Sequence, residues 1–515
     1  MGSMTSLQCA LDPLPTWLLK DCVEIMIPVI NKIINLSLTS GIFPTSMKEA
    51  KVKPLIKKPS LNGEILKNYR PVSNLSFISK LIEKAVSSQL KTYLDTNNLN
   101  EPFQSAYRKG HSTETALLRV KNDIMMAVDQ KKAVILVLLD LSAAFDTIDH
   151  EVLFARLKYH LGVSGVVLNW FKSYLDNRSQ SVSIDKVTSD RLHLRYGVPQ
   201  GSVLGPLLFV AYTLPLGSIA RSHGVNIHMY ADDTQLYVSL DVNDQDAMDT
   251  NIHKLETCIE NIRTWMSSNK LKLNDEKTDI ILVSTPYHKL IGDQITIRIG
   301  DSTISPSKCT RNLGVQFDRF MNMEGQISSI CKSCYAQLHS IKKIKSLLTP
   351  EAMRIVVHSF ITSRIDYCNS LLIGLPHQQI QRLQRIQNIA ARIISGAGKY
   401  EHITPVLQAL HWLPVQERIQ FKILLLTYRA LNGLAPGYLS DLVIPRSNPR
   451  TLRSSSRMVL CIPKSRLHSY GDASFAAAAA HLWNSLPREV TEAASIGQFK
   501  ITLKTYLFKQ AFRCN

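Results

Sequence analysis

The sequence has little that would mark it as a secreted or membrane protein. Its nine cysteines are scattered without a repeated spacing, and no signal peptide is visible. Apolar runs such as 133–139 are too short to cross a bilayer, which takes about 20 residues. We therefore expect an intracellular protein with reduced thiols and no membrane segment.

Zinc-binding patterns are also scarce. Cys331 and Cys334 form a single Cys-x-x-Cys pair, and no second pair of ligands lies at a suitable distance. We expect these two thiols to pack within a helix.

Acidic residues are few compared with basic ones. The 515 residues include 41 Asp and Glu against 60 Lys and Arg, a formal net charge of +19. Residues 321–515 hold 24 basic and 9 acidic residues, so they carry +15 of that charge. This asymmetry favours a polyanionic partner, although a merely solvated basic surface is the alternative. A chain of this length, 45% apolar, can form two or three domains.

The apolar periodicity predicts an α/β chain that becomes helical and basic after about residue 315. The predicted helices are 12–45, 76–94, 113–128, 150–175, 246–268 and 380–394. The predicted extended segments are parts of 51–72, the run ending at Asp140, a hairpin over 225–238, and 270–283. Because the hairpin carries two carboxylates, we expect the sheet to be antiparallel at its centre.

Two basic segments near the C-terminus leave two interpretations open. Arg385 and Arg392 flank an apolar stripe on one predicted helix, which either faces nucleic acid or is an ordinary surface helix. Residues 446–466 contain no acid and form a predicted extended linker that either grips phosphates or is solvated. Its basic residues are Arg446, Arg450, Arg453, Arg457, Lys464 and Arg466.

The most informative feature is the tetrapeptide Tyr-Ala-Asp-Asp at 230–233, together with Asp140, which ends a strand-like apolar run. Asp140 and Asp232 are 92 residues apart, so only a fold can bring them together. An Asp pair in a turn is more often only turn chemistry. Three carboxylates converging at strand ends can instead hold two divalent metal ions for phosphoryl transfer. We assign Asp140 and Asp232 as direct ligands, with Asp233 beside them.

Two further segments suit a nucleotide site. Phe145 lies five residues after Asp140, where a ring under the sugar would clash with a ribose 2′-hydroxyl; a core phenylalanine is the alternative. In the segment 197–206, Gly201 and Gly205 allow close backbone approach, and Gln200 can reach sugar or phosphate. A purely structural turn before a helix is the alternative there.

Basic side chains upstream and downstream could contact the triphosphate. Lys57, Lys58, Arg70 and Arg108 are candidates, although each alone is more often a surface charge. Lys277 is a candidate for protonating the leaving pyrophosphate. Asp146 and Asp149 are expected to serve in turns or helix caps.

These segments, in this order, resemble the reverse transcriptase of LINE-type (non-LTR) retrotransposons, most closely the jockey-like group. The matching segments are 68–73, 104–110, 139–146, 197–208, 230–233, 273–278 and 313–314, and residues 370–515 are similar to the thumb and tail of such elements.

The resemblance implies a right-hand polymerase with an α/β (α+β) palm, fingers, a helical thumb and a small helical tail. The expected divisions are 1–37 as an N-terminal helical segment, 38–318 as fingers and palm, 319–445 as thumb, 446–466 as basic linker and 467–515 as tail.

The resemblance also implies an RNA-directed DNA polymerase that uses two Mg²⁺ ions, with Mn²⁺ as a substitute. Its partners would be an RNA template, a DNA primer or target, and dNTPs, in a ribonucleoprotein of cytoplasm and nucleus. By position, the resemblance implies that Asp140, Asp232 and Asp233 are metal ligands and that Phe145 discriminates between sugars. It also implies that Gln200 and Arg70 contact the nucleotide and that Leu313 and Gly314 form the primer grip. Beside these, we expect Lys277 to be catalytic and further nucleotide contacts from Lys58, Arg108, Leu141 and Gly201.

Elements of this kind normally encode an endonuclease ahead of the polymerase, and we expect that activity from a region absent in this chain. No RNase H acid pattern, Cys/His knuckle or downstream nuclease signature is visible. A catalytically inactive or domesticated nucleic-acid-binding relic is the main alternative. A group II intron maturase or a telomerase is less favoured by the context 142–146.

Overall fold

A computed structural model describes residues 11–12, 14–142, 145–185, 187–288, 295–300, 302–446 and 458–512. The chain forms two compact units that alternate along the sequence. The first unit comprises residues 1–107, 140–222 and 259–274, and the second comprises 108–139, 223–258 and 275–515. Among the sequence predictions, Ala143, Ala144, Arg450, Arg453, Arg457, Cys9 and Cys514 lie outside the described residues. The linear division expected from the sequence stays a prediction.

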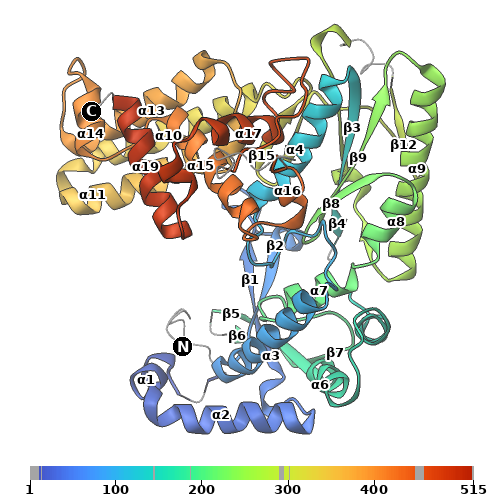
Figure 1. The fold of residues 1–515 in the computed structure, drawn as a ribbon. Coiled ribbons are helices and arrows are strands. Elements are labelled where there is room, and N and C mark those ends of the chain that lie inside the picture. The colour runs from blue at the N-terminus through green and yellow to red at the C-terminus, as the bar shows by residue number, and fades with distance from the viewer. Residues whose placement is uncertain are drawn as a thin grey trace. The chain divides into compact units, whose positions relative to one another are not determined.

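The first unit combines helices with a five-stranded sheet (Figure 1). Its helices are α1 (Thr16–Asp21), α2 (Val23–Ser40), α3 (Phe77–Thr96), α5 (His150–Ala155), α6 (Gly165–Leu175), α7 (Gly205–Tyr212) and α8 (Leu216–Ser222). Its strands are β1 (Glu49–Ile56), β2 (Tyr69–Asn74), β4 (Leu141–Ser142), β5 (Arg178–Ile184), β6 (Val187–Thr188), β7 (Leu192–Leu194) and β10 (Lys272–Leu273). Short 3-10 turns are η1 (Thr45–Met47) and η2 (Leu66–Asn68), and η3 (Arg156–His160) is a π-helix.

The sheet of the first unit is built on the antiparallel pair β1–β2. Strand β5 adds to β1 in parallel, and β6 and β7 pair with β5. An aromatic cluster anchors α2 nearby, because Trp170 Nε1 donates to Ser37 Oγ over 3.0 Å and Phe43 packs edge-on against Trp170. The predicted helix over 12–45 is wrong as a single element, because the chain forms α1 and α2, and α2 ends at Ser40 with Gly41 as its C-cap in the left-handed region, φ 68°.

The predicted helix over 150–175 is wrong as a single element. The chain forms α5, the π-helix η3 and then α6, with a break over 161–164. Gly162 lies in this break with φ +69°, a conformation that glycine adopts without steric cost.

Helix α2 is the one described helix that is long and apolar enough to cross a membrane, by length and composition only. Core helices of soluble proteins and signal sequences pass the same test. The expectation of no membrane segment therefore stays a prediction.

The second unit combines a four-stranded sheet with many helices. Its strands are β3 (Lys132–Leu139), β8 (Asn226–Tyr230), β9 (Asp233–Asp241), β11 (Asp279–Val283), β12 (Ile297–Ile299), β13 (Ser302–Ile304), β14 (Cys309–Asn312) and β15 (Val315–Asp318). Its longer helices are α4 (Thr113–Asp129), α10 (Glu324–Lys343), α11 (Pro350–Val357), α13 (His377–Ser395), α14 (Ile403–Ala409), α15 (Val415–Leu431), α17 (Phe475–Ser485) and α19 (Ile496–Phe512). Shorter helical pieces are η4 (Asp275–Lys277), η6 (Lys345–Leu347), η7 (His358–Thr362), α12 (Ser363–Asp366), η8 (Asn369–Leu372), α16 (Gly437–Ser440) and α18 (Arg488–Thr491). Helix α9 (Gln245–Ser268) contributes residues to both units.

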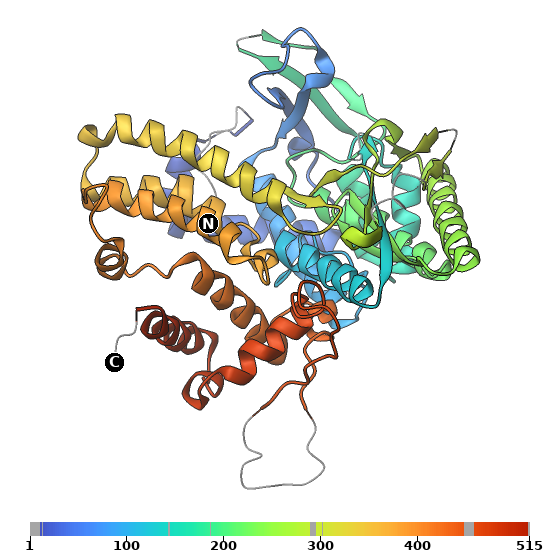
Figure 2. The same cartoon turned by 90° about the horizontal axis from the view of Figure 1, so that it is seen from above.

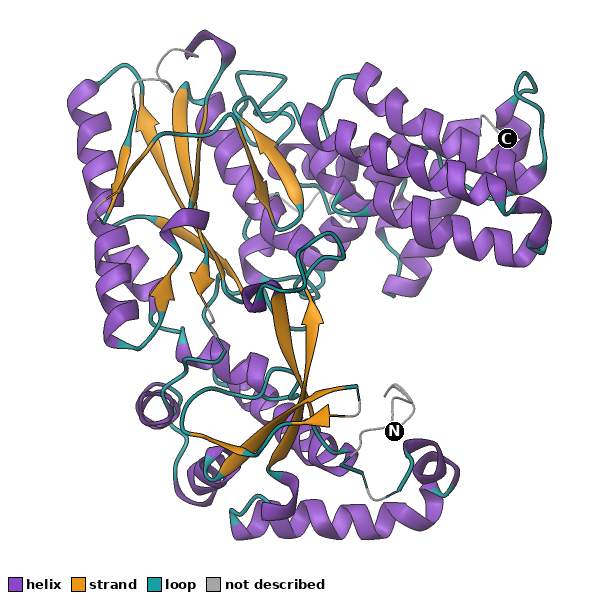
Figure 3. Cartoon of the chain, turned by 180° about the vertical axis from the view of Figure 1, so that it is seen from behind, coloured by secondary structure: helices purple, strands orange, loops and turns teal. Residues whose placement is uncertain are grey.

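The sheet of the second unit has the order β11-β3-β9-β8, and every neighbouring pair is antiparallel (Figure 3). The expectation of an antiparallel centre is therefore confirmed. Strand β3 lies in the middle with residues 133–137 and Leu139 buried, which is why it is almost continuously apolar. Helix α4 packs on β3.

The C-terminal helices belong to the same unit as α4 and this sheet. Helices α10 and α13 lie side by side (Figure 2), and α15 packs against α17 and α19. Ala476 N donates to Asn122 Oδ1 over 3.0 Å, which ties α17 to α4. The carboxylate of Asp129, at the end of α4, accepts from the backbone of Arg466 and Leu467.

The seven cysteines in the described ranges are free thiols. Cys331 and Cys334 lie buried in α10, and burial raises the pKa of both. The prediction that this pair packs within a helix is confirmed.

Candidate functional site

The candidate metal residues are found where the central strand of the second unit ends. The register pairs Leu139, the last residue of β3, with Thr234, the second residue of β9. On the other side, Leu138 pairs with Asp279, the first residue of β11. Both neighbours of β3 therefore begin where β3 ends, and Asp140 follows Leu139 by one peptide bond.

The two adjacent aspartates lie at the tip of the β8–β9 hairpin. Tyr230 and Asp233 are the last paired residues, so Ala231 and Asp232 form a two-residue turn. Ala231 has a positive φ of 57°, which is uncommon for a residue with a side chain. Asp232 is half-buried and Asp233 is exposed. The predicted hairpin with the Asp pair at its turn is confirmed.

Within the described ranges, the structure groups no three His, Cys, Asp or Glu side chains so that they could hold a metal ion. Lys277 is exposed at the end of η4, two residues before β11 begins. Asp232, Asp233 and Lys277 thus approach one edge of the same sheet.

The predicted primer grip is the turn of the β14–β15 hairpin. Asn312 pairs with Val315, and the turn residues Leu313 and Gly314 have φ of 43° and 85°. Asn312 Nδ2 donates to Gln235 Oε1 over 2.7 Å, and both side chains are buried. Because Gln235 follows Thr234 in β9, this bond places the turn close to the start of β9.

The first unit contains a cavity of about 330 Å³, and Gln200 is the one predicted nucleotide contact in its described lining. Gln200 lines it, donating from Nε2 to Asp146 Oδ2 over 3.1 Å and accepting at its backbone oxygen from Ser73 N over 2.7 Å. The other lining residues are Pro71, Gln180, Leu194, Tyr196, Gly197, Val198 and Pro199. The ring of Phe145 is half-buried and packs against Phe209, with 5.0 Å between centroids.

The two further aspartates behave differently from each other. Asp149 is the N-cap of α5, accepting from Val152 N over 3.1 Å, so its predicted role is confirmed. Asp146 lies in a turn, as expected, and also lines the cavity. Desolvation raises the pKa of its carboxyl group, and the hydrogen bond from Gln200 opposes that shift.

Gly201 occupies a position where a residue with a Cβ would be strained. Its φ is +120°, and an added Cβ would lie 2.5 Å from Ser73 O. The backbone of 200–201 is therefore pressed against β2. The close approach of Gly201 to a substrate stays a prediction.

Glu83 is a buried carboxylate that the sequence interpretation missed. It accepts from the backbone of Val203 over 2.7 Å and Leu204 over 3.2 Å, and so holds the segment that begins α7. Desolvation raises its pKa, while the charge of Arg178 opposes the shift. An acid on the otherwise apolar face of the helix 76–94 was the signal that could have revealed it.

The remaining predicted nucleotide contacts are spread over several elements. Lys58 and Arg70 are exposed on and beside the β1–β2 hairpin, and the described lining of the cavity does not include them. Arg108 is half-buried shortly before α4. Leu141 is buried in β4, where it pairs with Leu273, and Asn274 N donates to Asp140 O over 2.9 Å.

One of the two C-terminal arginine candidates has a structural role. Arg392 donates to the carbonyl groups of Gly398 and Glu401 in the loop that follows α13. Arg385 is exposed on the same helix. Of these two arginines, Arg385 is therefore the one that could still face nucleic acid.

A comparison with known families matches residues 56–317, just over half of the chain, to "Reverse transcriptase (RNA-dependent DNA polymerase)". The chain belongs to this family. The palm-type polymerase fold with mixed α/β content is thereby confirmed, together with the resemblance stated from the sequence.

The relatives of the chain include proteins named as RNA-directed DNA polymerases of transposons and mobile elements. The chain is 27% identical over 397 residues to a probable RNA-directed DNA polymerase from transposon BS of Drosophila melanogaster, covering 75% of this chain and 42% of the relative. It is 26% identical over 380 residues to the RNA-directed DNA polymerase from mobile element jockey of the same species, covering 72% and 40%. The chain thus spans about two fifths of these curated relatives.

Among solved structures, apo telomerase from Candida tropicalis is similar with a TM-score of 0.39 and 10% identity, over 73% of this chain and 67% of that one.

Proposed function

We propose that this chain is an RNA-directed DNA polymerase, which transfers deoxynucleotides to a primer 3′-hydroxyl on an RNA template. The β3–β9 register carries the proposal. It brings the residue before Asp140 opposite the residue after Asp233, so that strand ends 92 residues apart in sequence meet at one sheet edge.

Asp140, Asp232 and Asp233 are the residues proposed to hold two Mg²⁺ ions. Their carboxylate oxygens are the hard ligands that Mg²⁺ prefers, and a turn tip and a strand end leave them accessible to a nucleotide. When bound, such a pair of ions activates the primer hydroxyl and neutralises charge on the leaving pyrophosphate. Lys277, close to β11, would supply a proton to that leaving group.

The cavity of the first unit is proposed to receive part of the incoming nucleotide. Gln200, with its amide oriented by Asp146, offers hydrogen-bonding groups for sugar or phosphate. Phe145, held by Phe209, would exclude a ribose 2′-hydroxyl. Gly201 allows the backbone to lie close, and Leu141, Lys58, Arg70 and Arg108 complete the proposed contacts.

In this proposal residues 38–318 supply fingers and palm, with the four-stranded sheet in the palm, and the basic C-terminal helices form the thumb and tail. The excess of +15 in residues 321–515 supports nucleic-acid binding by that part. RNA template, DNA primer and dNTPs are the proposed partners.

Primer extension with purified protein tests the proposal. We expect synthesis on an RNA template with dNTPs and Mg²⁺, and we expect Asp232→Asn to slow it by about 1,000-fold, or about 4 kcal/mol of barrier. Asp149→Asn is the matched control, because asparagine caps a helix as well as aspartate does. No synthesis by folded wild type, or equal rates for wild type and Asp232→Asn, would refute the proposal.

The basic C-terminal part favours a second candidate, a nucleic-acid-binding protein without synthesis. That candidate predicts salt-sensitive RNA or DNA binding, unchanged by Asp140→Asn, and no extension product.

A further inference from the structure

The turn proposed to grip the primer contains a residue in an unfavourable backbone conformation. Leu313 has φ of 43°, in the left-handed region that glycine and asparagine adopt more readily. A bulky residue persists there only when its surroundings determine the conformation, and such outliers cluster at ligand-holding sites. The contacts of Leu313 therefore help to hold the turn in its conformation.

The body of this hairpin is fixed to the sheet of the second unit at two points. Asn312 bonds to Gln235 of β9, and Thr310 Oγ1 donates to Asp279 Oδ2 of β11 over 3.0 Å. These bonds hold strand β14. Neither bond involves the carbonyl oxygen of Leu313 at the tip, which accepts a hydrogen bond from another residue.

That partner is Tyr367, which lies 54 residues further along the chain. Its hydroxyl donates to Leu313 O over 2.7 Å and lies 3.3 Å from Thr113 Oγ1, at the start of α4. The ring also covers Gly314, because a Cβ added to that glycine would lie 3.2 Å from the hydroxyl oxygen. Tyr367 thus contacts both residues of the turn.

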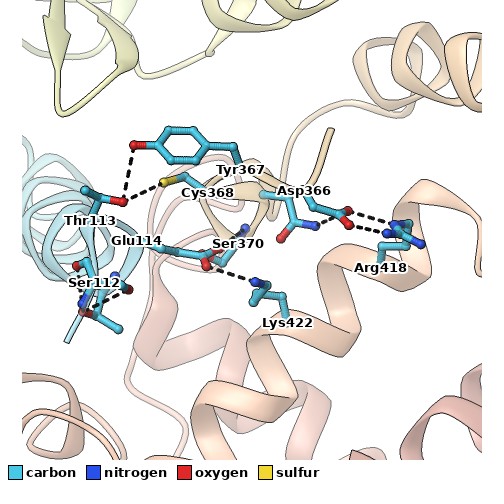
Figure 4. Close-up of polar contacts among 11 residues, drawn as sticks. Ser112, Thr113, Glu114, Asp366, Tyr367, Cys368, Ser370, Arg418 and Lys422 are labelled. Atoms are coloured by element: carbon cyan, nitrogen blue, oxygen red, sulfur yellow. Dashed lines mark hydrogen bonds and ion pairs between the residues drawn. The ribbon is translucent and has the colours of Figure 1, made fainter. Parts of the chain in front are cut away.

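The backbone around Tyr367 is held in turn by a polar cluster (Figure 4). Arg418 of α15 forms an ion pair with Asp366, with Nε 2.8 Å from Oδ1. Glu114 of α4 accepts from both the backbone and the hydroxyl of Ser370, and Lys422 lies 3.2 Å from its other oxygen. The segment 366–370 is therefore fastened on both sides of Tyr367.

We propose that Tyr367 is a positioning residue for the primer end, acting through the turn of Leu313 and Gly314. This inference rests on the proposed function, since it takes that turn as the primer grip. The tyrosine lies in the turn between α12 and η8, whose polar contacts hold it in place. The tyrosine in turn holds the tip of the hairpin in the conformation that a primer contacts. The alternative is a bond that contributes only to stability.

A matched pair of variants separates these interpretations. Tyr367→Phe removes only the hydroxyl. Tyr428→Phe also removes a tyrosine hydroxyl that donates to a backbone carbonyl, that of Ala493 over 2.9 Å, but this bond joins α15 to the C-terminal helices and does not touch the turn. Loss of stability alone would affect Tyr428→Phe at least as much as Tyr367→Phe, because Tyr428 is buried and Tyr367 is exposed.

Two measurements should be made on the full chain. Hydrogen–deuterium exchange of the peptide 309–318 should speed up about 5-fold in Tyr367→Phe and stay unchanged in Tyr428→Phe, as expected for the loss of one hydrogen bond at the turn. In primer extension, Tyr367→Phe should raise the KM for primer–template about 5-fold, while kcat at saturating primer stays within about 2-fold of wild type.

Exchange that is unchanged in Tyr367→Phe, or equally faster in both variants, overturns the positioning role whether or not the protein synthesises DNA. Faster exchange without any change in the KM of an active enzyme shows that the tyrosine holds the turn but not the primer, which also overturns the proposal. If wild type makes no DNA but the exchange result is as expected, the proposed function fails while the contact of Tyr367 with the turn stands.

Discussion

At the scale of single residues, burial fixes the charge of several polar side chains. His228 lies in β8 with no exposed surface, against the ring of Tyr438. Desolvation, followed by the charges of Arg119 and His111, lowers the pKa of His228 to about 3. The folded protein therefore holds this histidine neutral.

This burial predicts a loss of stability in mild acid. The unfolded chain protonates His228 near pH 6.5 and the folded chain does not, so stability is full above pH 6.5 and falls as the pH drops toward 3. The slope is about 1.4 kcal/mol per pH unit, or about 2 kcal/mol by pH 5. Urea unfolding of wild type and His228→Gln at pH 7 and pH 5 measures this loss of unfolding free energy. The variant should lose less stability than wild type, and the exposed His253→Gln should match wild type; equal losses in all three would contradict the assignment.

Phe145 gives a second test at this scale. If its ring lies under the incoming sugar, Phe145→Val should reduce the preference for dNTPs over rNTPs by about 10- to 100-fold in kcat/KM. Thermal unfolding should be measured beside it, because the ring also packs on Phe209. A lower melting temperature with an unchanged preference for dNTPs would show that Phe145 packs in the core and does not discriminate between sugars.

At the scale of elements, the segment before α7 is held by strand β2 on one side and by a buried carboxylate on the other. Ser73 N bonds to Gln200 O, and Glu83 bonds to the backbone of Val203 and Leu204. The shape of the cavity beside Gln200 therefore depends on contacts made by the backbone.

Gly201→Ala should disturb this segment. The added methyl would meet Ser73 O at 2.5 Å with φ at +120°, so we expect a loss of about 2–3 kcal/mol in stability and a raised KM for dNTPs. Gly224→Ala is the control, because its φ is +65° but nothing lies within 4 Å of the new Cβ. That variant should lose about 1 kcal/mol and keep its KM. Equal effects of the two substitutions would mean that contact with β2 does not matter.

The elements show what a sequence can and cannot predict. Strand β3, the β8–β9 hairpin and α4 were predictable because their apolar patterns reflect which faces are buried. Strand β5 was not predicted, since Arg178–Ile184 is polar and serine-rich and owes its place to pairing with β1. Glu83 and Tyr367 were missed for a related reason: their roles are set by partners 120 and 54 residues away.

At the scale of the whole molecule, three chain segments make up each compact unit, so the units cannot be read from consecutive sequence. The C-terminal helices share a unit with α4, because Asn122 and Asp129 of α4 bond to residues beyond 465. The candidate ligands were found from motifs, but the pairing of Leu139 with Thr234 is a long-range contact that only the fold supplies.

Asp140 and the Asp232–Asp233 pair are proposed to hold the same metal ions. Fe²⁺ substituted for Mg²⁺ and treated with ascorbate and peroxide generates radicals that cut the backbone next to the ion. We predict cuts near residue 140 and near residue 232 in the same sample, both suppressed by excess Mg²⁺ and both lost in Asp140→Asn. Cuts near only one of these positions, or a cut near 232 that survives Asp140→Asn, would contradict the account.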